Sequence, residues 1–270
     1  MNVLLPDTVE ELFAALGRDG ARVLAGGTDL LVRMRAGAGK EAPGTLVGLE
    51  RIAELRGVSR ERGWVRIGAA ETHAALLENR LVRARLPLLA SALSVLGGPA
   101  VRAMGAIGGN VCTASPAGDS LPPLYVHEAE AELWSARGVR RMPIGEFITG
   151  PGRTALEPGE ILAALRVPEA RNFDLVHFEK VGRRNALAIS VVSLAVLARR
   201  DASGRVAEAR LAVGSAGPTV LRQPEAEALF AGRRLTLSAL RPVAAAVRRG
   251  VRPMDDLRAT AAYRRQVAGN

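Results

Sequence analysis

Two glycine pairs are the residues whose type and spacing best suit the binding of an anion. Gly26-Gly27 lies in the run from Ala25 to Asp29, directly after a short apolar stretch, and Gly108-Gly109 lies in the run from Gly105 to Asn110. Glycine permits close approach and positive φ angles, so each pair could present several backbone N–H groups on one side. Such groups of amides bind pyrophosphate, although either pair alone would also suit a tight turn.

Other kinds of site chemistry are not indicated. Neither glycine pair matches the G-x-G-x-x-G fingerprint or a Walker loop, which disfavours a Rossmann domain. His73, His127 and His177 do not have zinc-ligand spacing, and no nucleophile elbow is visible. Cys112 is the single cysteine, so the chain cannot hold an iron–sulfur cluster or an intrachain disulfide, and we interpret it as a small buried packing residue.

Composition predicts a globular protein. The chain has 270 residues, of which 48% are hydrophobic, enough for a substantial core divided into two or three units. The net charge of +10 comes from scattered arginines, with Lys40 and Lys180 as the only lysines, and aromatic content is 3%, which disfavours nucleic-acid binding. No long apolar run or signal peptide is seen, so we expect no membrane span and a cytoplasmic location.

The elements that must position the glycine pairs follow from periodicity and caps. The N-terminal part reads as helix, strand, glycine turn and helix, with Thr8 and Glu11 as a capping box and Thr28-Asp29 as the second cap. The glycine-rich segment 97–119 is too long for a simple turn, and we expect an ordered irregular loop. Further strands are predicted at 22–25, 45–49, 64–67, 131–135, 139–142 and 160–167, and helices at 72–77 and 86–96.

The C-terminal part is predicted to follow a linker at 168–172. Segments 175–181, 188–200 and 206–214 alternate apolar and polar residues and read as an antiparallel meander. Three helices are expected at 225–230, 238–247 and 259–267.

The second glycine pair belongs to the run GAIGGNVCTASPAGD, from Gly105 to Asp119, and the run DDLRATAAYR extends from Asp255 to Arg264. Together with the first glycine pair, these runs resemble the FAD-binding medium subunits of the xanthine dehydrogenase and carbon monoxide dehydrogenase family of molybdenum hydroxylases. The resemblance spans nearly the whole chain. It implies an α+β fold with a two-part FAD-binding domain of the vanillyl-alcohol-oxidase or PCMH type, followed by a C-terminal antiparallel sheet with helices.

The resemblance also implies domain bounds and partners. The FAD-binding domain would span residues 1–170, with subdomains of about 1–55 and 56–170, and the C-terminal flavoprotein domain would span 171–270. The molybdenum cofactor and two [2Fe–2S] clusters would lie on partner subunits, a molybdopterin large subunit and an iron–sulfur small subunit. The expected assembly is a dimer of heterotrimers, in which this oxidoreductase subunit passes electrons from a cluster to NAD, a quinone or another acceptor.

By position, the resemblance implies a set of cofactor-binding residues. Backbone amides of the two glycine motifs would clasp the FAD pyrophosphate, Thr113 would add a hydroxyl donor, and Asp119 would accept from ribose or ribityl hydroxyls. Leu162 would touch the ring system, and Lys180 would place a cation near the flavin. The full set is Leu24, Ala25, Gly26, Gly27, Thr28, Asp29, Leu30, Ala106, Ile107, Gly108, Gly109, Asn110, Thr113, Asp119, Leu162 and Lys180.

The chain departs from some relatives at three positions. Leu96 replaces an aromatic residue that can stack on the flavin, Ala100 replaces a glutamine, and Ala106 replaces a hydroxyl-bearing residue. The residues on one flavin face are therefore not specified by the sequence. Three other functions stay open: a stand-alone FAD-dependent reductase or oxidase of the same superfamily, a non-catalytic assembly subunit without flavin, and a nucleic-acid-binding protein. The last would need tight polyanion binding that survives moderate salt.

Overall fold

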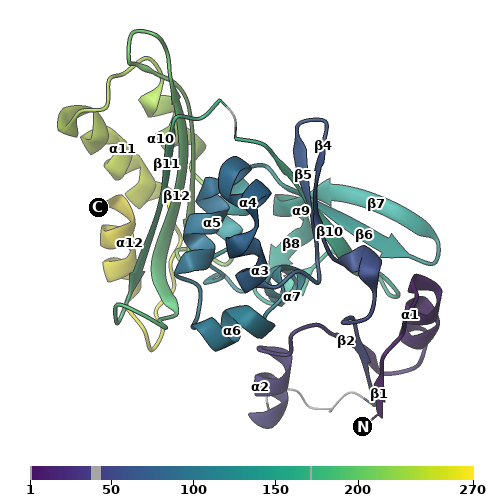
Figure 1. Cartoon of the computed structure of the whole chain (residues 1–270). Coiled ribbons are helices and arrows are strands. Elements are labelled where there is room, and N and C mark those ends of the chain that lie inside the picture. The colour runs from purple at the N-terminus through teal and green to yellow at the C-terminus, as the bar shows by residue number, and fades with distance from the viewer. Residues whose placement is uncertain (1, 38–43, 171) are drawn as a thin grey trace.

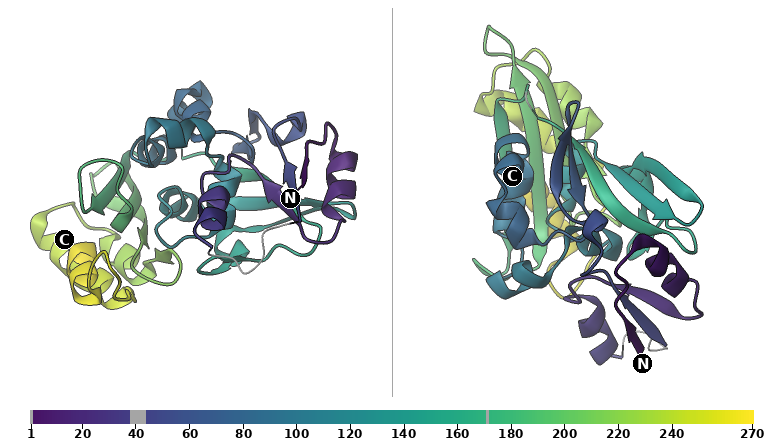
Figure 2. Two further views of the ribbon diagram at one scale, coloured as in Figure 1. Left: turned by 90° about the horizontal axis from the view of Figure 1, so that it is seen from below. Right: turned by 45° about the vertical axis from the view of Figure 1, so that its right-hand side comes forward.

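A computed structural model describes residues 2–37, 44–170 and 172–270 of the chain. Three regions follow one another across the molecule, from a small N-terminal unit through a central sheet with helices to a C-terminal sheet (Figure 1). Figure 2 shows the same order from two further sides, with the N-terminal and C-terminal regions at opposite ends. Lys40 and part of the predicted linker 168–172 lie outside the described residues.

The N-terminal unit is a three-stranded parallel sheet in the order β1-β3-β2. As predicted, Thr8 caps its first helix by accepting a hydrogen bond from the Glu11 amide at 3.2 Å. Leu12, Val47 and Ile52 form much of its core. The first glycine motif starts directly at the carboxyl end of β2. The elements are β1 (Asn2–Leu4), α1 (Val9–Leu16), β2 (Ala21–Leu24), α2 (Leu30–Arg35), β3 (Thr45–Gly48) and the 3-10 helix η1 (Ala53–Leu55).

The central region is built on a five-stranded antiparallel sheet in the order β4-β5-β10-β6-β7. The predicted strands at 64–67, 131–135, 139–142 and 160–167 all occur in it. The edge strand β4 and the small hairpin β8-β9 were not predicted. The strands are β4 (Val58–Glu61), β5 (Trp64–Gly68), β6 (Glu130–Ser135), β7 (Gly138–Pro143), β8 (Ile148–Gly150), β9 (Arg153–Thr154) and β10 (Ile161–Pro168).

A run of short helices connects β5 to β6 and carries much of the main core. Segment 97–119, which we expected to be irregular, contains the two helices α6 and α7, so that expectation was wrong. Pro99 opens α6 at a position where its missing N–H costs no hydrogen bond. The helices of the central region are α3 (His73–Glu78), α4 (Arg80–Arg85), α5 (Pro87–Ser94), α6 (Pro99–Met104), α7 (Ile107–Thr113), α8 (Leu121–Val126) and α9 (Ile144–Phe147).

The C-terminal region is a four-stranded sheet with helices on one face, and its predicted antiparallel meander is confirmed. Helices α10 to α12 cover that face, while α5 and α8 of the central region pack on the other (Figure 1). The elements are β11 (Leu175–Gly182), β12 (Ser190–Arg200), β13 (Val206–Gly214), β14 (Leu221–Arg222), α10 (Pro224–Phe230), α11 (Leu237–Gly250) and α12 (Ala261–Gly269).

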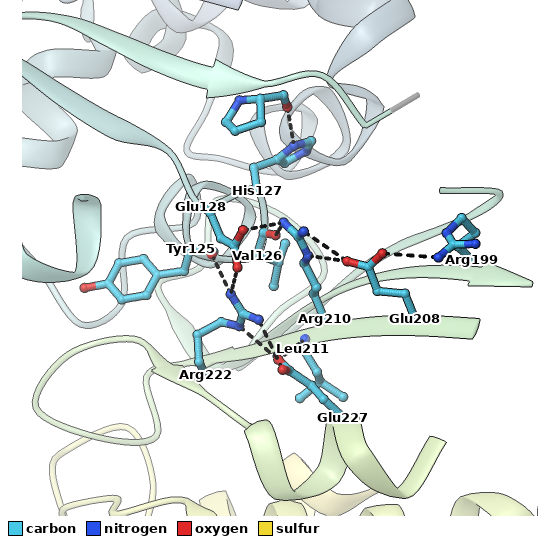
Figure 3. Close-up of polar contacts among 11 residues, drawn as sticks. Tyr125, Val126, His127, Glu128, Arg199, Glu208, Arg210, Leu211, Arg222 and Glu227 are labelled. Carbon is cyan, nitrogen blue, oxygen red and sulfur yellow. Dashed lines mark hydrogen bonds and ion pairs between the residues drawn. The ribbon is translucent and has the colours of Figure 1, made fainter. Parts of the chain in front are cut away.

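Charged side chains join the end of α8 to this sheet (Figure 3). Arg210 donates to the Val126 carbonyl at 3.3 Å, and Arg222 donates to the Tyr125 carbonyl at 3.2 Å. Both guanidinium groups also pair with Glu128, at 2.9 and 3.4 Å. Cations near the last carbonyls of a helix are favourable, so these contacts help to hold the C-terminal sheet against the central region.

Candidate cofactor-binding site

A cavity of about 670 Å³ collects residues from all three regions. Its wall includes residues 22–30 of the N-terminal unit, parts of the segment from Ala69 to Asp119 and residues 187–189 from the turn between β11 and β12. Every predicted cofactor-binding residue lines it except Ile107, which is buried in the core, and Lys180. The size is typical of a pocket for a small ligand or cofactor.

The first glycine motif presents unpaired backbone donors to this cavity. The amides of Gly26, Gly27, Thr28, Asp29 and Leu30 donate to no residue in the part of the chain that the structure describes. Gly27 has φ +67°, and a Cβ at Gly26 would lie 1.7 Å from the Met104 carbonyl oxygen. Glycine is therefore required at both positions, by backbone conformation at one and by close approach at the other.

Contrary to the prediction, Asp29 does not cap α2 with its side chain. It occupies the N-cap position of α2, but its carboxylate makes no capping hydrogen bond. Instead it accepts a bond from the Thr113 hydroxyl at 3.3 Å and pairs with Arg33 at 3.3 Å. The Leu30 amide at the start of α2 is therefore not capped by a side chain, and Asp29 links the first glycine motif to the end of α7.

The second glycine motif has most of its amides already paired. Ile107 donates to the Glu71 carbonyl and Gly108 to the Ala69 carbonyl, each at 2.9 Å. A Cβ at Gly108 would lie 2.5 Å from the Ala69 Cβ, whereas at Gly109 the nearest neighbour would be the Ala25 Cβ at 3.9 Å. Gly108 thus serves helix packing, and Gly109 leaves open space facing the first motif.

Asp119 and Lys180 form a buried ion pair at the edge of the cavity. The Lys180 ammonium donates to Asp119 Oδ2 at 2.5 Å and to the Val95 carbonyl at 3.0 Å. Burial raises the pKa of Asp119, and the Lys180 contact opposes that rise. Asp119 Oδ1 is buried and has no hydrogen-bond partner among the described residues. One carboxylate oxygen is therefore held by lysine, and the other has no partner among the described residues.

Thr113 and Cys112 lie on the last turn of α7. The Thr113 hydroxyl is within 2.9 Å of the Gly109 carbonyl and 3.3 Å of Asp29, so its proton already has acceptors. Cys112 is half-buried, packs partly against the main core and also lines the cavity. The predicted packing role therefore accounts for only some of its contacts. Burial raises the pKa of its thiol to about 12, which keeps it uncharged.

Sequence reasoning missed several residues of the cavity wall. They include His73, which lies at the first position of α3, and Leu187 to Ile189, which reach the cavity from the C-terminal region. Nothing local in the sequence indicates these contacts, because they join segments that are far apart along the chain.

No group of histidine, cysteine or carboxylate side chains able to hold a metal ion is found among the described residues. Nor does any described helix have the length and apolarity to cross a membrane.

The cavity fits a dinucleotide cofactor. A run of free amides suits a pyrophosphate, and a buried carboxylate oxygen without a partner suits a sugar hydroxyl. The wall also contains apolar residues such as Leu24, Ile161 and Leu162. These features come from residues 24–30, 106–119 and 156–162, which the fold brings to one place.

Comparisons with known proteins agree with this geometry. Residues 1–170 match the family of FAD binding domains in molybdopterin dehydrogenase, and residues 177–270 match the CO dehydrogenase flavoprotein C-terminal domain. The xanthine dehydrogenase FAD-binding subunit of Escherichia coli O157:H7 is 36% identical over 247 residues, covering 90% of this chain and 83% of that protein. The carbon monoxide dehydrogenase medium chain of Hydrogenophaga pseudoflava is 33% identical and covers 98% of this chain and 91% of the relative.

Solved structures have the same fold. A carbon monoxide dehydrogenase structure from Hydrogenophaga pseudoflava matches with a TM-score of 0.93 at 34% identity, over 100% of this chain and 93% of that one. Quinoline 2-oxidoreductase from Pseudomonas putida 86 matches with a TM-score of 0.94 at 25% identity and the same coverage. The predicted fold class is confirmed. The chain therefore belongs to the family of FAD-binding medium subunits of the xanthine dehydrogenase and carbon monoxide dehydrogenase type, which are oxidoreductase subunits of molybdenum hydroxylases.

Proposed function

We propose that this chain binds one FAD in the cavity and passes electrons from a partner [2Fe–2S] subunit to NAD, a quinone or another acceptor. The observation that carries the proposal is the run of five amides from Gly26 to Leu30 that have no partner among the described residues, on the wall of a cavity of about 670 Å³. Backbone donors gathered in this way stabilise an anion, and the FAD pyrophosphate is the anion that the family would supply.

Other residues have roles that follow from this placement. Gly109 leaves room for the cofactor between the two glycine motifs, with its own amide unpaired among the described residues. Asp119 Oδ1 would accept from a ribose or ribityl hydroxyl, and Leu162 would lie against a ring. Lys180 acts through Asp119, because its ammonium is already bound to that carboxylate. When bound, FAD supplies the redox chemistry, since a flavin exchanges both single electrons and hydride.

Electron transfer requires partners, because one cysteine cannot hold an iron–sulfur cluster. The curated relatives are named medium chains or FAD-binding subunits, which supports a complex with a [2Fe–2S] small subunit and a molybdopterin large subunit. We propose a dimer of such heterotrimers, located in the cytoplasm, in which residues 1–170 and 171–270 are the two domains. The organic substrate would be bound by the molybdenum subunit.

The first test is the absorption spectrum of the purified chain before and after heat denaturation. We expect a flavin band near about 450 nm and release of about one FAD per chain, because the band belongs to the cofactor itself. A colourless chain that does not take up added FAD would contradict the proposal and would favour a non-catalytic assembly subunit.

A second test addresses electron transfer. The co-expressed iron–sulfur subunit should co-purify with this chain, and mixing the flavin-loaded chain with the pre-reduced iron–sulfur subunit should bleach the flavin band in a stopped-flow experiment. Failure to associate, combined with oxidation of a substrate by the chain alone, would instead indicate a stand-alone flavin reductase or oxidase.

A further inference from the structure

His73 is a buried histidine at the point where the two glycine motifs meet. Its exposed fraction is 2%, and its backbone amide donates to the Gly105 carbonyl at 3.0 Å. A Cβ placed on Gly105 would lie 3.2 Å from His73 Cδ2 and 3.3 Å from the Thr28 hydroxyl oxygen. The imidazole and the Thr28 hydroxyl therefore both lie close to Gly105, and His73 lines the same cavity as the unpaired amides of the first glycine motif.

The ring has no hydrogen-bond partner among the residues that the structure describes. Nδ1 is buried and unpaired, whereas Nε2 also makes no hydrogen bond to a described residue but is not fully buried, so Nε2 is the nitrogen that can face the cavity. Arg102, whose positive charge acts on the ring, is already engaged, because its guanidinium donates to the carbonyls of Leu96 and Gly97 at 2.9 and 3.1 Å. Buried polar groups are usually hydrogen-bonded, so a ring without a protein partner at a cavity wall can take its partner from a ligand in that cavity.

The charge state of the ring fits a hydrogen-bond donor. Burial, together with the nearby positive charge of Arg102, lowers the pKa of His73 to about 4, so the imidazole is neutral near pH 7. A neutral imidazole carries a single N–H. Because Nδ1 is enclosed without an acceptor, the proton is better placed on Nε2, where a ligand oxygen can accept it.

We propose that His73 Nε2–H donates a hydrogen bond to a phosphate oxygen of the bound dinucleotide, beside the free amides of the first glycine motif. This inference rests on the proposed binding of FAD. A phosphate is favoured over a hydroxyl because the ring and the Thr28 side chain both approach Gly105, which places the ring near the unpaired amides, and donors that gather at one place select an anion.

The test compares three ligands on the flavin-free chain by calorimetry. FAD and ADP share the pyrophosphate, whereas riboflavin has only the ring and the ribityl chain. In His73→Leu we expect affinities for FAD and ADP to fall together by about tenfold to a hundredfold, the usual effect of losing a hydrogen bond to a charged group. Riboflavin binding should not change.

Two further variants separate this contact from a packing role. His73→Gln places an amide nitrogen near the position of Nε2 and should recover most of the affinity, whereas His73→Asn, whose amide falls near Nδ1, should not. His127→Leu is the matched control, since His127 is also buried with an unpaired ring nitrogen but does not line the cavity. Because Nδ1 has no partner to lose, the ligand-free His73→Leu chain should melt within a few degrees of wild type.

The outcomes are distinct. Unchanged FAD affinity in His73→Leu, a loss for FAD and riboflavin with ADP unaffected, or a failure of His73→Gln to recover would each overturn the role of His73 while leaving FAD binding intact. A wild-type chain that binds neither FAD nor ADP would overturn the proposed function itself.

Discussion

Adjacent residues of the second glycine motif have different surroundings. A Cβ at Gly108 would overlap Ala69 at 2.5 Å, whereas a Cβ at Gly109 would meet only Ala25, at 3.9 Å. The sequence presents them as an equivalent pair, but only Gly109 is positioned to keep the cavity open. Substitution at Gly109 therefore separates ligand binding from folding more cleanly than substitution at Gly26, Gly27 or Gly108.

Gly109→Leu should weaken FAD binding by about tenfold to a hundredfold, because a side chain in the space between the glycine motifs costs about as much as overpacking a core. Equilibrium titration with FAD gives the affinity, and urea unfolding of the flavin-free chain should show little change. Gly44→Leu is the control, since a Cβ at Gly44 would meet nothing within 4 Å and Gly44 does not line the cavity. Normal FAD affinity in Gly109→Leu would contradict the placement of the cofactor.

Asp119 and Lys180 show how one pair can serve both the fold and a ligand. Their side chains are 8% and 9% exposed, so each charge would be costly alone. The lysine neutralises the carboxylate and holds Oδ2, and Oδ1 stays without a protein partner in the described chain. Lys180 comes from β11, so this contact also joins the C-terminal sheet to the cavity.

At the scale of elements, the position of α7 depends on its contact with the end of β5. The amides of Ile107 and Gly108 donate to carbonyls of Glu71 and Ala69, and Gly108 lets the helix backbone approach Ala69 closely. This packing sets the direction of α7 and hence the positions of Gly109 and Thr113 along the cavity wall.

Gly108→Ala should destabilise the chain by about 1 to 3 kcal/mol, because the added methyl group cannot be accommodated against the Ala69 backbone without a shift. The free energy of unfolding from urea titration measures the effect. Adding Ala69→Gly removes the facing methyl group and should recover part of the loss, a coupling that two independent sites would not show. Strict additivity of the two substitutions would show that α7 is not held by this contact.

At the scale of the whole molecule, the cavity depends on all three regions staying together. The contacts of Arg210 and Arg222 with the end of α8 hold the C-terminal sheet in place (Figure 3). His127 is buried beside them, with Nδ1 at 3.1 Å from the Pro168 carbonyl at the end of β10. Burial is the main cause that lowers the pKa of His127 to about 4, as it is for His73.

These two histidines should make the fold sensitive to acid. Each folded-state pKa of about 4 lies below the ordinary value of 6.5, so between these values the unfolded chain binds protons that the folded chain does not. Their contribution to the free energy of unfolding is fully present above about pH 6.5 and is lost as pH falls. The loss is about 2 to 3 kcal/mol for each histidine between pH 7 and 4.5. Urea unfolding of wild type and His127→Leu at both pH values measures this.

The variant should lose less stability than wild type over the same pH range, because one of the two protonation sites is gone. If wild type and His127→Leu lose equal stability, His127 does not titrate as its burial implies, and the acid sensitivity would then belong to other groups.

Much of the element order could be predicted from local sequence. The alternation of apolar and polar residues over 175–214 predicted the C-terminal meander, and the caps at Thr8 and Thr72 predicted the starts of α1 and α3. The short edge strand β4 was missed because it has little apolar signal of its own and is defined by its pairing with β5. The helices in segment 97–119 were missed because each is short and is stabilised by contacts with distant residues.

The sequence by itself determined the family, the two glycine motifs and the cofactor class, since these depend on residue types at fixed spacing. Only the tertiary structure decided which amides stay free, which glycine packs and which one opens the cavity, and that His73 and the 187–189 turn belong to its wall. The physical reason is that hydrogen-bond satisfaction and close approach are properties of pairs of segments. Gly108 and Gly109 are alike in the chain and differ only because Ala69 lies against one of them.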